Sequence, residues 1–221
     1  MPTPQFDRPL ALKDQVYRIL RDRVRQGDLT PQDRLVDATL ARDMNISRTP
    51  VREALQLMVH EGLLDTTTRG FKLSELDQTE VGHLFELRLL LEPTVAAKSA
   101  MTSDRKGADR LVACIAQAGE TADDATPHRF NAAIYRFFEI LTSLCDNRVM
   151  AQSVLLYHDR LAQLRAHMMA SPKHRALAAQ GYMSVANAIA AGDAATAQEA
   201  SEKHIRIGIA TCRTLGLMSK I

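Results

Sequence analysis

The spacing of apolar residues divides the chain into an N-terminal region of short elements and a longer region that is helical almost throughout. From position 12 onward, apolar side chains recur mostly three or four residues apart, the spacing of one helix face, until Gly27 and Pro31 interrupt the pattern. The members of this predicted stripe are Leu12, Val16, Ile19, Leu20 and Val24. Residues 63–73 alternate and are rich in threonine, with Gly70 at their centre, which predicts a small β-hairpin.

Two short helices separated by a four-residue turn are predicted between these segments. The first begins near Asp37, a favourable N-cap residue, and ends near Met44. Asn45 tolerates the left-handed conformation that a tight turn requires, and Ser47 can cap a second helix that runs to His60. The side chains expected to face the core are Leu40, Ala41, Met44, Val51, Ala54, Leu55 and Met58.

The second of these helices carries a polar face near its N-terminus. Arginine can donate two hydrogen bonds to O6 and N7 of a guanine, and serine and threonine hydroxyls can donate to phosphate oxygens. Two arginines alone would suggest an ordinary solvated helix, but the ordered series of helix, turn, helix and hairpin favours a DNA-binding helix-turn-helix with a wing. The residues predicted to contact DNA are Ser47, Arg48, Thr49, Arg52 and Gln56 from the helix, with Arg69 and Gly70 from the wing tip.

Beyond a polar linker at residues 75–80, the pattern is helical as far as residue 218. Breaks near residues 103, 126–127, 146–147, 171–172 and 192–193 leave six segments of helical length, which suggests an antiparallel bundle. The first ten residues contain three prolines and are predicted to form a flexible arm. The predicted organisation is an arm at 1–10, a DNA-binding domain at 11–74, the linker and a helical domain at 81–218.

Composition narrows the class of protein further. Of the 221 residues 46% are hydrophobic, enough for a substantial core, and the net charge of +2 means that any basic patch is local. The three cysteines are widely spaced, which argues against a disulfide framework or a zinc site, and no signal peptide or membrane span is recognisable. We therefore expect a cytoplasmic protein without membrane contact. The sequence also lacks the common catalytic motifs, so we predict no catalytic residues and no enzyme activity.

The helix-turn-helix region resembles a known family. The stretch "DRLVDATLARDMNISRTPVREALQLMVHEGLL", and above all "SRTPVREAL" at 47–55, is similar to the winged helix-turn-helix of GntR-family bacterial transcription regulators. The resemblance covers about residues 10–74 and implies base and phosphate contacts from the helix and wing residues named above. The sequence departs from the family pattern in "PQDRL" at 31–35, in Asp37 where glutamate is commoner, and in Ala38 and Thr39 where a charged pair is frequent.

The helical region is similar to the FCD ligand-binding domain of the FadR subfamily. The matching stretches are "HLFELRLLLEPTVAAKSA" at 83–100, "YRFFEILTSLCDN" at 135–147 and "ANAIAAGDAATAQEASEKHI" at 186–205. The resemblance implies a bundle of six or seven helices that dimerises and encloses a small carboxylate-type effector. Together the two parts predict a mainly α protein with an N-terminal winged helix-turn-helix and an antiparallel all-α bundle.

Many members of that subfamily hold a divalent metal ion in the pocket with one aspartate and three histidines. The equivalent positions are found by counting from Asn147 and Asp193. They fall on Ile134, Phe138, Tyr182 and His204. Only His204 is a metal-binding residue type, and a lone imidazole binds zinc or nickel weakly. A slip of three residues would place Asn131 and Tyr135 in the first two positions, but these are also poor ligands. The sequence therefore predicts a pocket without metal or other cofactor.

Arg88 lies one helical turn before Glu92, and two interpretations of this pair stay open. The pair can be a surface ion pair worth a few tenths of a kcal/mol, or Arg88 can lie half inside the bundle, where an effector carboxylate would serve as its partner. The predicted effector-binding positions are Arg88, Ile134, Phe138, Tyr182 and His204. Apolar residues at 134 and 138 favour an effector less polar or larger than a short hydroxy- or dicarboxylate. Several other bundle residues are expected at the surface or an interface, namely His128, His158, His167, His174, Arg160 and Arg165.

The sequence thus predicts a homodimeric transcription regulator, a repressor, that binds a short pseudo-palindromic operator in double-stranded DNA. A small effector, expected to contain a carboxylate, would modulate its DNA affinity from the bundle. The alternative is a DNA-binding protein whose bundle has become unresponsive to ligands.

Overall fold

The computed structural model describes residues 11–102 and 104–219, so the arm predicted at 1–10 lies outside the described residues. The described chain forms two compact units. The first contains the described residues up to Glu75 apart from 25–27, and the second contains 25–27 and the described residues from Leu76 onward. No helix of the described ranges is both long and apolar enough to cross a membrane.

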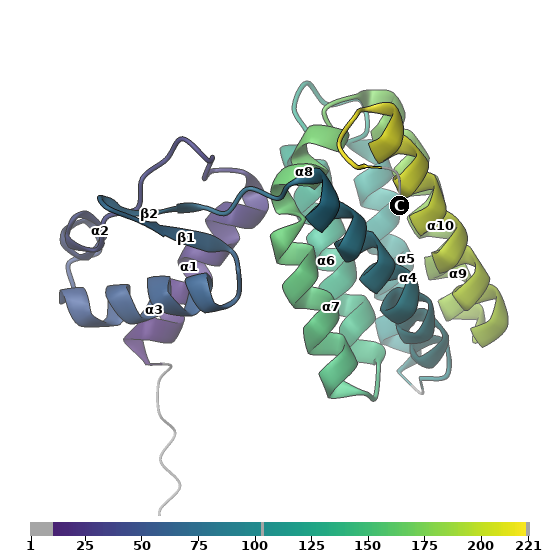
Figure 1. Cartoon of the computed structure of the whole chain (residues 1–221). Helices are drawn as coiled ribbons and strands as arrows, with labels where there is room; N and C mark the ends of the chain where they lie inside the picture. The colour runs from purple at the N-terminus through teal and green to yellow at the C-terminus, as the bar shows by residue number, and fades with distance from the viewer. Residues whose placement is uncertain (1–10, 103, 220–221) are drawn as a thin grey trace, which may run out of the picture. The chain divides into compact units, whose positions relative to one another are not determined.

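The first unit contains three helices and a hairpin (Figure 1). These elements are α1 (Leu12–Gln26), α2 (Asp37–Asp43), α3 (Arg48–His60), β1 (Leu64–Thr67) and β2 (Gly70–Leu73). On α1, Val16, Leu20 and Val24 are buried as predicted, whereas Leu12 and Ile19 are 50% and 48% exposed. That part of the predicted stripe was wrong because Leu12 is the first helical residue and Ile19 lies about 100° around the helix from Leu20.

The helix-turn-helix has the predicted arrangement but different capping. The α3 residues expected to face the core, Val51, Ala54, Leu55 and Met58, are all buried. Asn45 has a φ of 53°, so the predicted left-handed turn residue is confirmed. Asp37 is the first helical residue rather than the N-cap, a position held by Val36. Ser47 does occupy the N-cap of α3, but its hydroxyl makes no capping hydrogen bond and stays exposed.

The hairpin is joined to the rest of the first unit by an isolated β-bridge between Leu35 and Phe71. Its two strands pair from Leu64 opposite Leu73 to Thr67 opposite Gly70, leaving a two-residue loop. The backbone of Leu35 exchanges two hydrogen bonds of 2.8 Å with Phe71 on β2. Gly70 has a φ of 122°, and a Cβ there would collide with the carbonyl oxygen of Leu35. Glycine is therefore required at this position so that the wing can approach the 31–35 segment.

The second unit is the predicted helical bundle (Figure 1). Its described residues form seven helices: α4 (Gln78–Ala100), α5 (Arg105–Glu120), α6 (His128–Leu144), α7 (Arg148–Arg160), α8 (Ala162–Met168), α9 (Pro172–Ala191) and α10 (Ala194–Thr214). Helix α4 packs against α6, α7, α9 and α10, so residues on its inner faces lie at the centre of the bundle. The three cysteines are buried and free.

One helical segment expected from the sequence is divided at Leu161 into α7 and α8. The carbonyl oxygen of His158, at the end of α7, accepts hydrogen bonds from the Tyr135 hydroxyl at 3.3 Å and from Nη2 of Arg165 at 3.0 Å. Side chains that insert into the main-chain ladder in this way bend or interrupt helices. The apolar spacing does not reveal this break because the residues that cause it are polar.

Helix α4 begins inside the segment expected to be a linker. The Asp77 carboxylate accepts from the backbone N–H groups of Thr79 and Glu80 at 2.7 and 2.8 Å, and Glu80 in turn accepts from the Asp77 N–H at 3.1 Å. This reciprocal arrangement is a capping box, which satisfies backbone donors at a helix start. The acidic residues that made the segment look like a linker therefore start the helix.

Arg175, at the start of α9, is a fully buried cation that holds two loops together. Its guanidinium donates to the main-chain oxygens of Ala122, Asp124, Met169 and Ala170 at distances of 2.6, 2.6, 2.7 and 3.1 Å. Its exposed fraction is 0%. The loops that follow α5 and α8 are thus fixed to α9 by one side chain.

Candidate functional site

The N-terminal end of α3 presents a polar face to solvent. All five residues predicted to read DNA from this helix, Ser47, Arg48, Thr49, Arg52 and Gln56, are exposed. The opposite face of α3 is packed in the core of the first unit, which fixes the rotation of the helix. The exposed face therefore carries two guanidiniums, two hydroxyls and an amide, groups that can donate to base edges and phosphates.

Asp37 holds one of these arginines in place. Nη2 of Arg48 contacts both carboxylate oxygens of Asp37, at 2.9 and 3.1 Å. The Arg48 side chain is 64% exposed and that of Asp37 only 15% exposed. Because this contact uses a single nitrogen of a side chain that stays mostly exposed, Arg48 keeps other N–H groups that can donate to a ligand. The sequence analysis did not find this pair, since Asp37 was expected to cap α2.

The wing brings further basic side chains beside Arg69. Arg69 is exposed in the two-residue loop of the hairpin, as predicted. Arg34 and Lys72 border the same surface hollow as Arg69. Arg34 comes from the segment that pairs with β2, a pairing that the sequence pattern did not reveal. Gly70 lies against Leu35, so its clearest role is to shape the wing.

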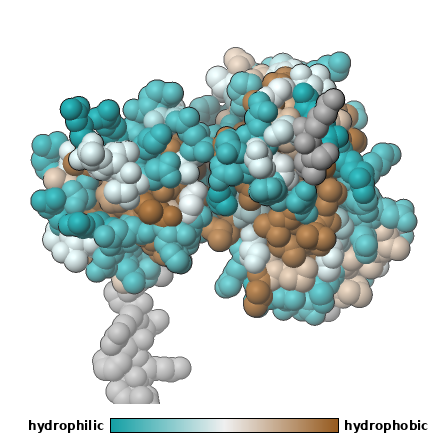
Figure 2. Space-filling view, in the orientation of Figure 1, coloured by the Kyte–Doolittle hydropathy of each residue, from teal (hydrophilic) through white to brown (hydrophobic). Residues whose placement is uncertain are grey.

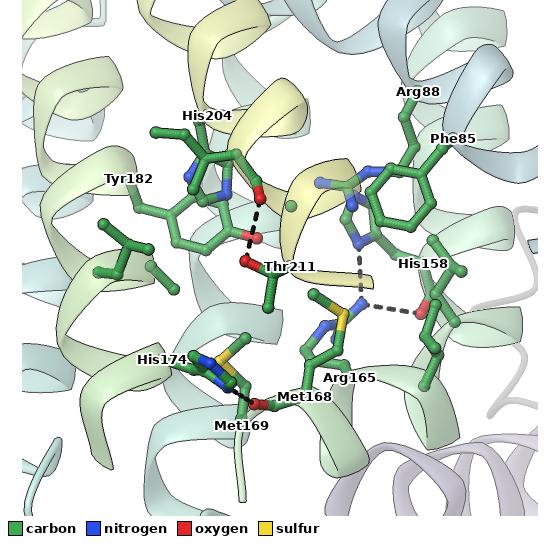
Figure 3. A pocket seen from close by; sticks show the side chains of 16 residues that line it. Phe85, Arg88, His158, Arg165, Met168, Met169, His174, Tyr182, His204 and Thr211 are labelled. Carbon is green, nitrogen blue, oxygen red and sulfur yellow. Dashed lines mark hydrogen bonds between the residues drawn. The ribbon is translucent and has the colours of Figure 1, made fainter. Parts of the chain in front are cut away.

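A cavity of about 60 Å³ lies inside the second unit (Figure 3). Helices α4, α7, α8, α9 and α10 all contribute lining side chains. Its polar lining consists of Arg88, His158, Arg165, His174, Tyr182, His204 and Thr211. Its apolar lining includes Phe85, Leu161, Leu164, Met168, Met169 and Ile207. The cavity thus combines several hydrogen-bonding groups with hydrocarbon and thioether walls, as ligand sites commonly do.

Glu92 organises the polar side of this cavity. Its Oε1 accepts from Nε of Arg88 at 2.6 Å, from the Tyr157 hydroxyl at 3.0 Å and from Nε2 of His158 at 3.1 Å. Glu92 and Arg88 are 3% and 8% exposed, so the pair is buried and the surface interpretation was wrong. Burial favours a raised pKa for the Glu92 carboxyl, but the Arg88 charge and the hydrogen bonds outweigh it and hold that pKa well below its usual range.

His158 links Glu92 to Arg165 as a neutral imidazole. Its Nε2 donates to the ionised Glu92, while its Nδ1 lies 2.9 Å from Nη2 of Arg165, a group that can only donate. Nδ1 therefore carries no hydrogen, which fixes the tautomer. Burial lowers the pKa of His158 to about 3, although Glu92 opposes that shift. The interaction with Glu92 thus fixes the ring orientation and, through it, the position of Arg165.

Two buried nitrogens at the cavity lack hydrogen-bond partners among the described residues. One is Nη1 of Arg165, whose side chain is held over the Tyr135 ring at 4.3 Å from the ring centroid. The other is Nδ1 of His204, which faces Gly181 on α9. Burial, with a smaller contribution from the nearby Arg88 charge, lowers the pKa of His204 to about 4. Buried polar groups are nearly always satisfied, so unpaired ones at a cavity indicate a site for a ligand or water.

The structure brings only part of the predicted effector set to the cavity. Arg88, Tyr182 and His204 line it, whereas Ile134 and Phe138 are buried beside it and do not. Phe138 stacks on His158 with ring centroids 3.5 Å apart and meets Tyr182 edge-on at 5.7 Å. The expectation that His158 and Arg165 lie at the surface was wrong: they are 1% and 8% exposed. No apolar period marks them, because they are buried by contacts between helices far apart in sequence.

The residues at the four metal-ligand positions do not fit a metal ion. Ile134 and Phe138 present only hydrocarbon, and the rings of Tyr182 and His204 pack together with centroids 4.0 Å apart. Across residues 11–102 and 104–219, no group of three or more histidine, cysteine, aspartate or glutamate side chains is placed to hold a metal. The polar chemistry of this pocket is therefore that of guanidinium, imidazole and phenol groups.

Two family models match the chain, one in each unit. Residues 12–70 match the family described as bacterial regulatory proteins, gntR family. Residues 83–207 match the FCD domain. The first match contains the helix-turn-helix and most of the hairpin, and the second contains the cavity and its lining residues up to Ile207.

Several known proteins are similar to the chain. The HTH-type transcriptional regulator YdhC of Bacillus subtilis (strain 168) is 27% identical over 152 residues, 65% of each protein. The Nta operon transcriptional regulator of Aminobacter aminovorans is 41% identical over 63 residues, 28% of this chain and 30% of that protein. The gluconate operon transcriptional repressor of Bacillus subtilis (strain 168) is 32% identical over 76 residues, 34% of this chain and 31% of that protein. The matches span less than two thirds of the length of each relative.

Solved structures share the fold over nearly the whole chain. Escherichia coli McbR/YncC has a TM-score of 0.80 at 18% identity, covering 94% of this chain and 100% of that one. A GntR transcriptional regulator from Rhodococcus sp. RHA1 has a TM-score of 0.77 at 19% identity, covering 94% and 99%. At this level of identity the likeness concerns the fold alone.

Proposed function

Because the chain belongs to the GntR family of bacterial regulatory proteins and carries an FCD domain, it is a transcription regulator, and we propose that it is a cytoplasmic repressor without enzyme activity. It would bind a short pseudo-palindromic operator as a homodimer and leave it when a small effector enters the bundle. Membership of the family implies DNA binding and effector regulation.

The observation that carries the DNA-binding proposal is the exposed N-terminal face of α3. Arg48 and Arg52 lie one turn apart and are both exposed, with Arg48 also contacting Asp37. The N-terminus of α3 adds unpaired backbone N–H groups and a partial positive charge, which favour a nearby phosphate. Basic wing residues can then contact the adjacent backbone, which supplies affinity, while the α3 side chains supply the sequence preference.

Selection of binding sites from random duplexes tests this proposal. The purified chain should enrich a short sequence with two-fold symmetry, because a two-fold dimer presents one α3 to each half-site. Affinity for the enriched site should exceed that for scrambled DNA by about 10³-fold or more at physiological salt. Equal affinity for both duplexes would contradict a sequence-specific regulator.

An exposed apolar face of the bundle supports the homodimer. On α4, Leu87 and Leu90 are 37% and 71% exposed, and on the adjoining α7, Val149 and Leu156 are 73% and 38% exposed. Figure 2 shows a brown patch on the face of the bundle formed by α4. Contiguous exposed apolar surface of this kind is typical of association sites.

Light scattering after size exclusion tests the dimer. The chain should elute with twice the mass of one chain, and Leu90→Glu should shift it toward the monomer because it places a charge in the apolar face. The matched control is Leu215→Glu, another exposed leucine, which lies beyond the end of α10. Monomeric wild-type protein at micromolar concentration would contradict the proposed dimer.

The cavity in the bundle supports effector regulation over the alternative of an unresponsive bundle. If the bundle bound no ligand, side chains that filled the cavity or paired with the buried Nη1 of Arg165 would make it more stable. We propose an effector that contains a carboxylate and is small, because the cavity measures about 60 Å³. Carboxylates should be screened for release of the operator in a fluorescence anisotropy assay. If none changes operator affinity, the unresponsive alternative is favoured.

We also propose that the pocket works without a metal ion. Two of the four positions that would supply ligands carry hydrocarbon side chains, Ile134 and Phe138. Elemental analysis of protein purified without chelators should find less than about 0.1 zinc or nickel ion per chain, since a single imidazole holds these ions weakly. A stoichiometric ion that is lost in His204→Ala would contradict the proposal.

A further inference from the structure

Two guanidiniums line the cavity of the bundle, but only one carboxylate is bonded to them. Arg88 uses Nε and Nη2 on the two oxygens of Glu92, at 2.6 and 3.4 Å. Arg165, the second cation, forms no ion pair within residues 11–102 and 104–219, and its Nη2 contacts Nδ1 of the neutral His158 ring and the His158 carbonyl oxygen. No aspartate or glutamate lines the cavity in the described part of the chain. Asp159, the buried carboxylate nearest in sequence, pairs with Arg25 at 2.5 Å within the same unit.

The position of Arg165 is fixed by its neighbours. Nη2 is occupied by His158, and the guanidinium plane lies on the ring of Tyr135. Nη1 is buried, has no partner among the described residues, and belongs to a side chain that lines the cavity. A buried guanidinium keeps its charge at any ordinary pH, so leaving it unpaired is costly. A charge-assisted donor on a side chain that lines the cavity is therefore left without a partner among the described residues.

We propose that Arg165, fixed by His158 and placed across the cavity from Tyr182 and His204, binds the carboxylate of a small ligand with a single negative charge. The guanidinium supplies the positive charge that binds the anion. The inference deepens the effector role proposed for this cavity and rests on it. Figure 3 shows Arg165 and Arg88 on one side of the cavity and Tyr182 and His204 on the other.

The walls of the cavity determine the rest of the ligand. A cavity of about 60 Å³ holds about four to six waters at 10–15 Å³ each, so the ligand has a similar number of non-hydrogen atoms. Leu161, Leu164 and Met168 line it beside Arg165 and offer contacts to a short hydrocarbon. A second carboxylate would find no further unpaired cation, because Arg88 is already neutralised by Glu92. The ligand class is a short monocarboxylate.

Calorimetric titration of the full chain tests whether the site selects a ligand with a single negative charge. Three probes with the same number of non-hydrogen atoms are compared. The probes are butyrate, its neutral isostere butyramide, and the dianion oxalate. Butyrate should bind saturably with one site per chain, and each of the other two should bind at least tenfold more weakly. Absence of saturable butyrate binding, or equal or tighter binding of oxalate or butyramide, would overturn the proposal.

Substitutions at position 165 test whether Arg165 supplies the positive charge that binds the carboxylate. Arg165→Met should weaken butyrate binding at least tenfold, and Arg165→Lys should weaken it less because it keeps the charge. Arg206→Met, at an exposed arginine of α10, is the control and should bind butyrate as the wild type does. Equal weakening in the Met and Lys variants would contradict an ionic role. If Arg165→Met does not fold, the three probes on wild-type protein decide.

Operator binding, measured on the same protein, separates this inference from the proposed function. If the chain binds its operator but fails the probe test, only the monocarboxylate inference is lost. If it binds butyrate as expected but shows no DNA preference, the regulator proposal fails while the ligand site stands.

Discussion

Acidification should destabilise the bundle, because His158 and His204 are held neutral inside it. Burial lowers the pKa of His158 from 6.5 to about 3 and that of His204 from 6.5 to about 4. In the unfolded chain these histidines take up protons near pH 6.5, whereas in the folded bundle they stay neutral to much lower pH. Their contribution to the free energy of unfolding is therefore fully present above pH 6.5 and is lost as the pH falls toward the pKa values of the folded state. At pH 5 this linkage lowers the free energy of unfolding by about 2 kcal/mol for each histidine. Because His204 is partly exposed, we expect a combined loss of about 3 to 4 kcal/mol.

Urea unfolding at pH 7, 6 and 5, followed by tyrosine near-ultraviolet circular dichroism, measures this loss. Three of the four tyrosines, at 135, 157 and 182, are buried in the bundle, so the signal reports on that unit. His204→Gln should remove about half of the pH-dependent loss, whereas His83→Gln, at an exposed position, should leave it unchanged. A wild-type loss below about 1 kcal/mol between pH 7 and pH 5 would refute the account of the buried neutral imidazoles.

Three substitutions test other parts of the structure. Arg175→Met should cost about 3–5 kcal/mol of unfolding free energy in urea, since it leaves buried carbonyls without a charged donor; wild-type stability would contradict the role given to Arg175. Gly70→Ala should cost about 2 kcal/mol in the first unit and weaken operator binding, because its φ is 122° and Leu35 blocks a Cβ; unchanged operator affinity would show that the wing tolerates the change. Asp37→Ala should reduce the ratio of operator to scrambled-DNA affinity about fivefold by freeing Arg48, and an unchanged ratio in the same anisotropy assay would remove the positioning role of the pair.

The first unit could be predicted from the sequence because its signals are local. Capping residues, a left-handed asparagine and an apolar stripe act within a few residues of one another, so the turn at Asn45 and the buried face of α3 were confirmed. Errors arose where a side chain had two possible partners. Asp37 could cap α2 or bind Arg48, and Asp77 could belong to a polar linker or start α4; in both cases the structure has the second arrangement.

The cavity was only partly predictable, because its chemistry depends on contacts between distant helices. Counting from family landmarks identified Tyr182 and His204, but the same count placed Ile134 and Phe138 at a cavity that they do not line. His158 and Arg165 are charged or polar residues with no periodic signal, so the sequence suggested exposure. They are buried because Glu92, more than sixty residues away, provides a partner for His158.

The central claim, that α3 reads base edges, is tested most directly by the affinity of Arg52→Ala for the enriched operator and for operators changed at single base pairs. His60→Ala, at the exposed far end of the same helix, is the matched control. The account predicts a loss of about 1–3 kcal/mol on the enriched operator, with little loss on operators altered at one position of each half-site, because a base-reading arginine discriminates there. An equal loss on every duplex, or no loss at all, would contradict it.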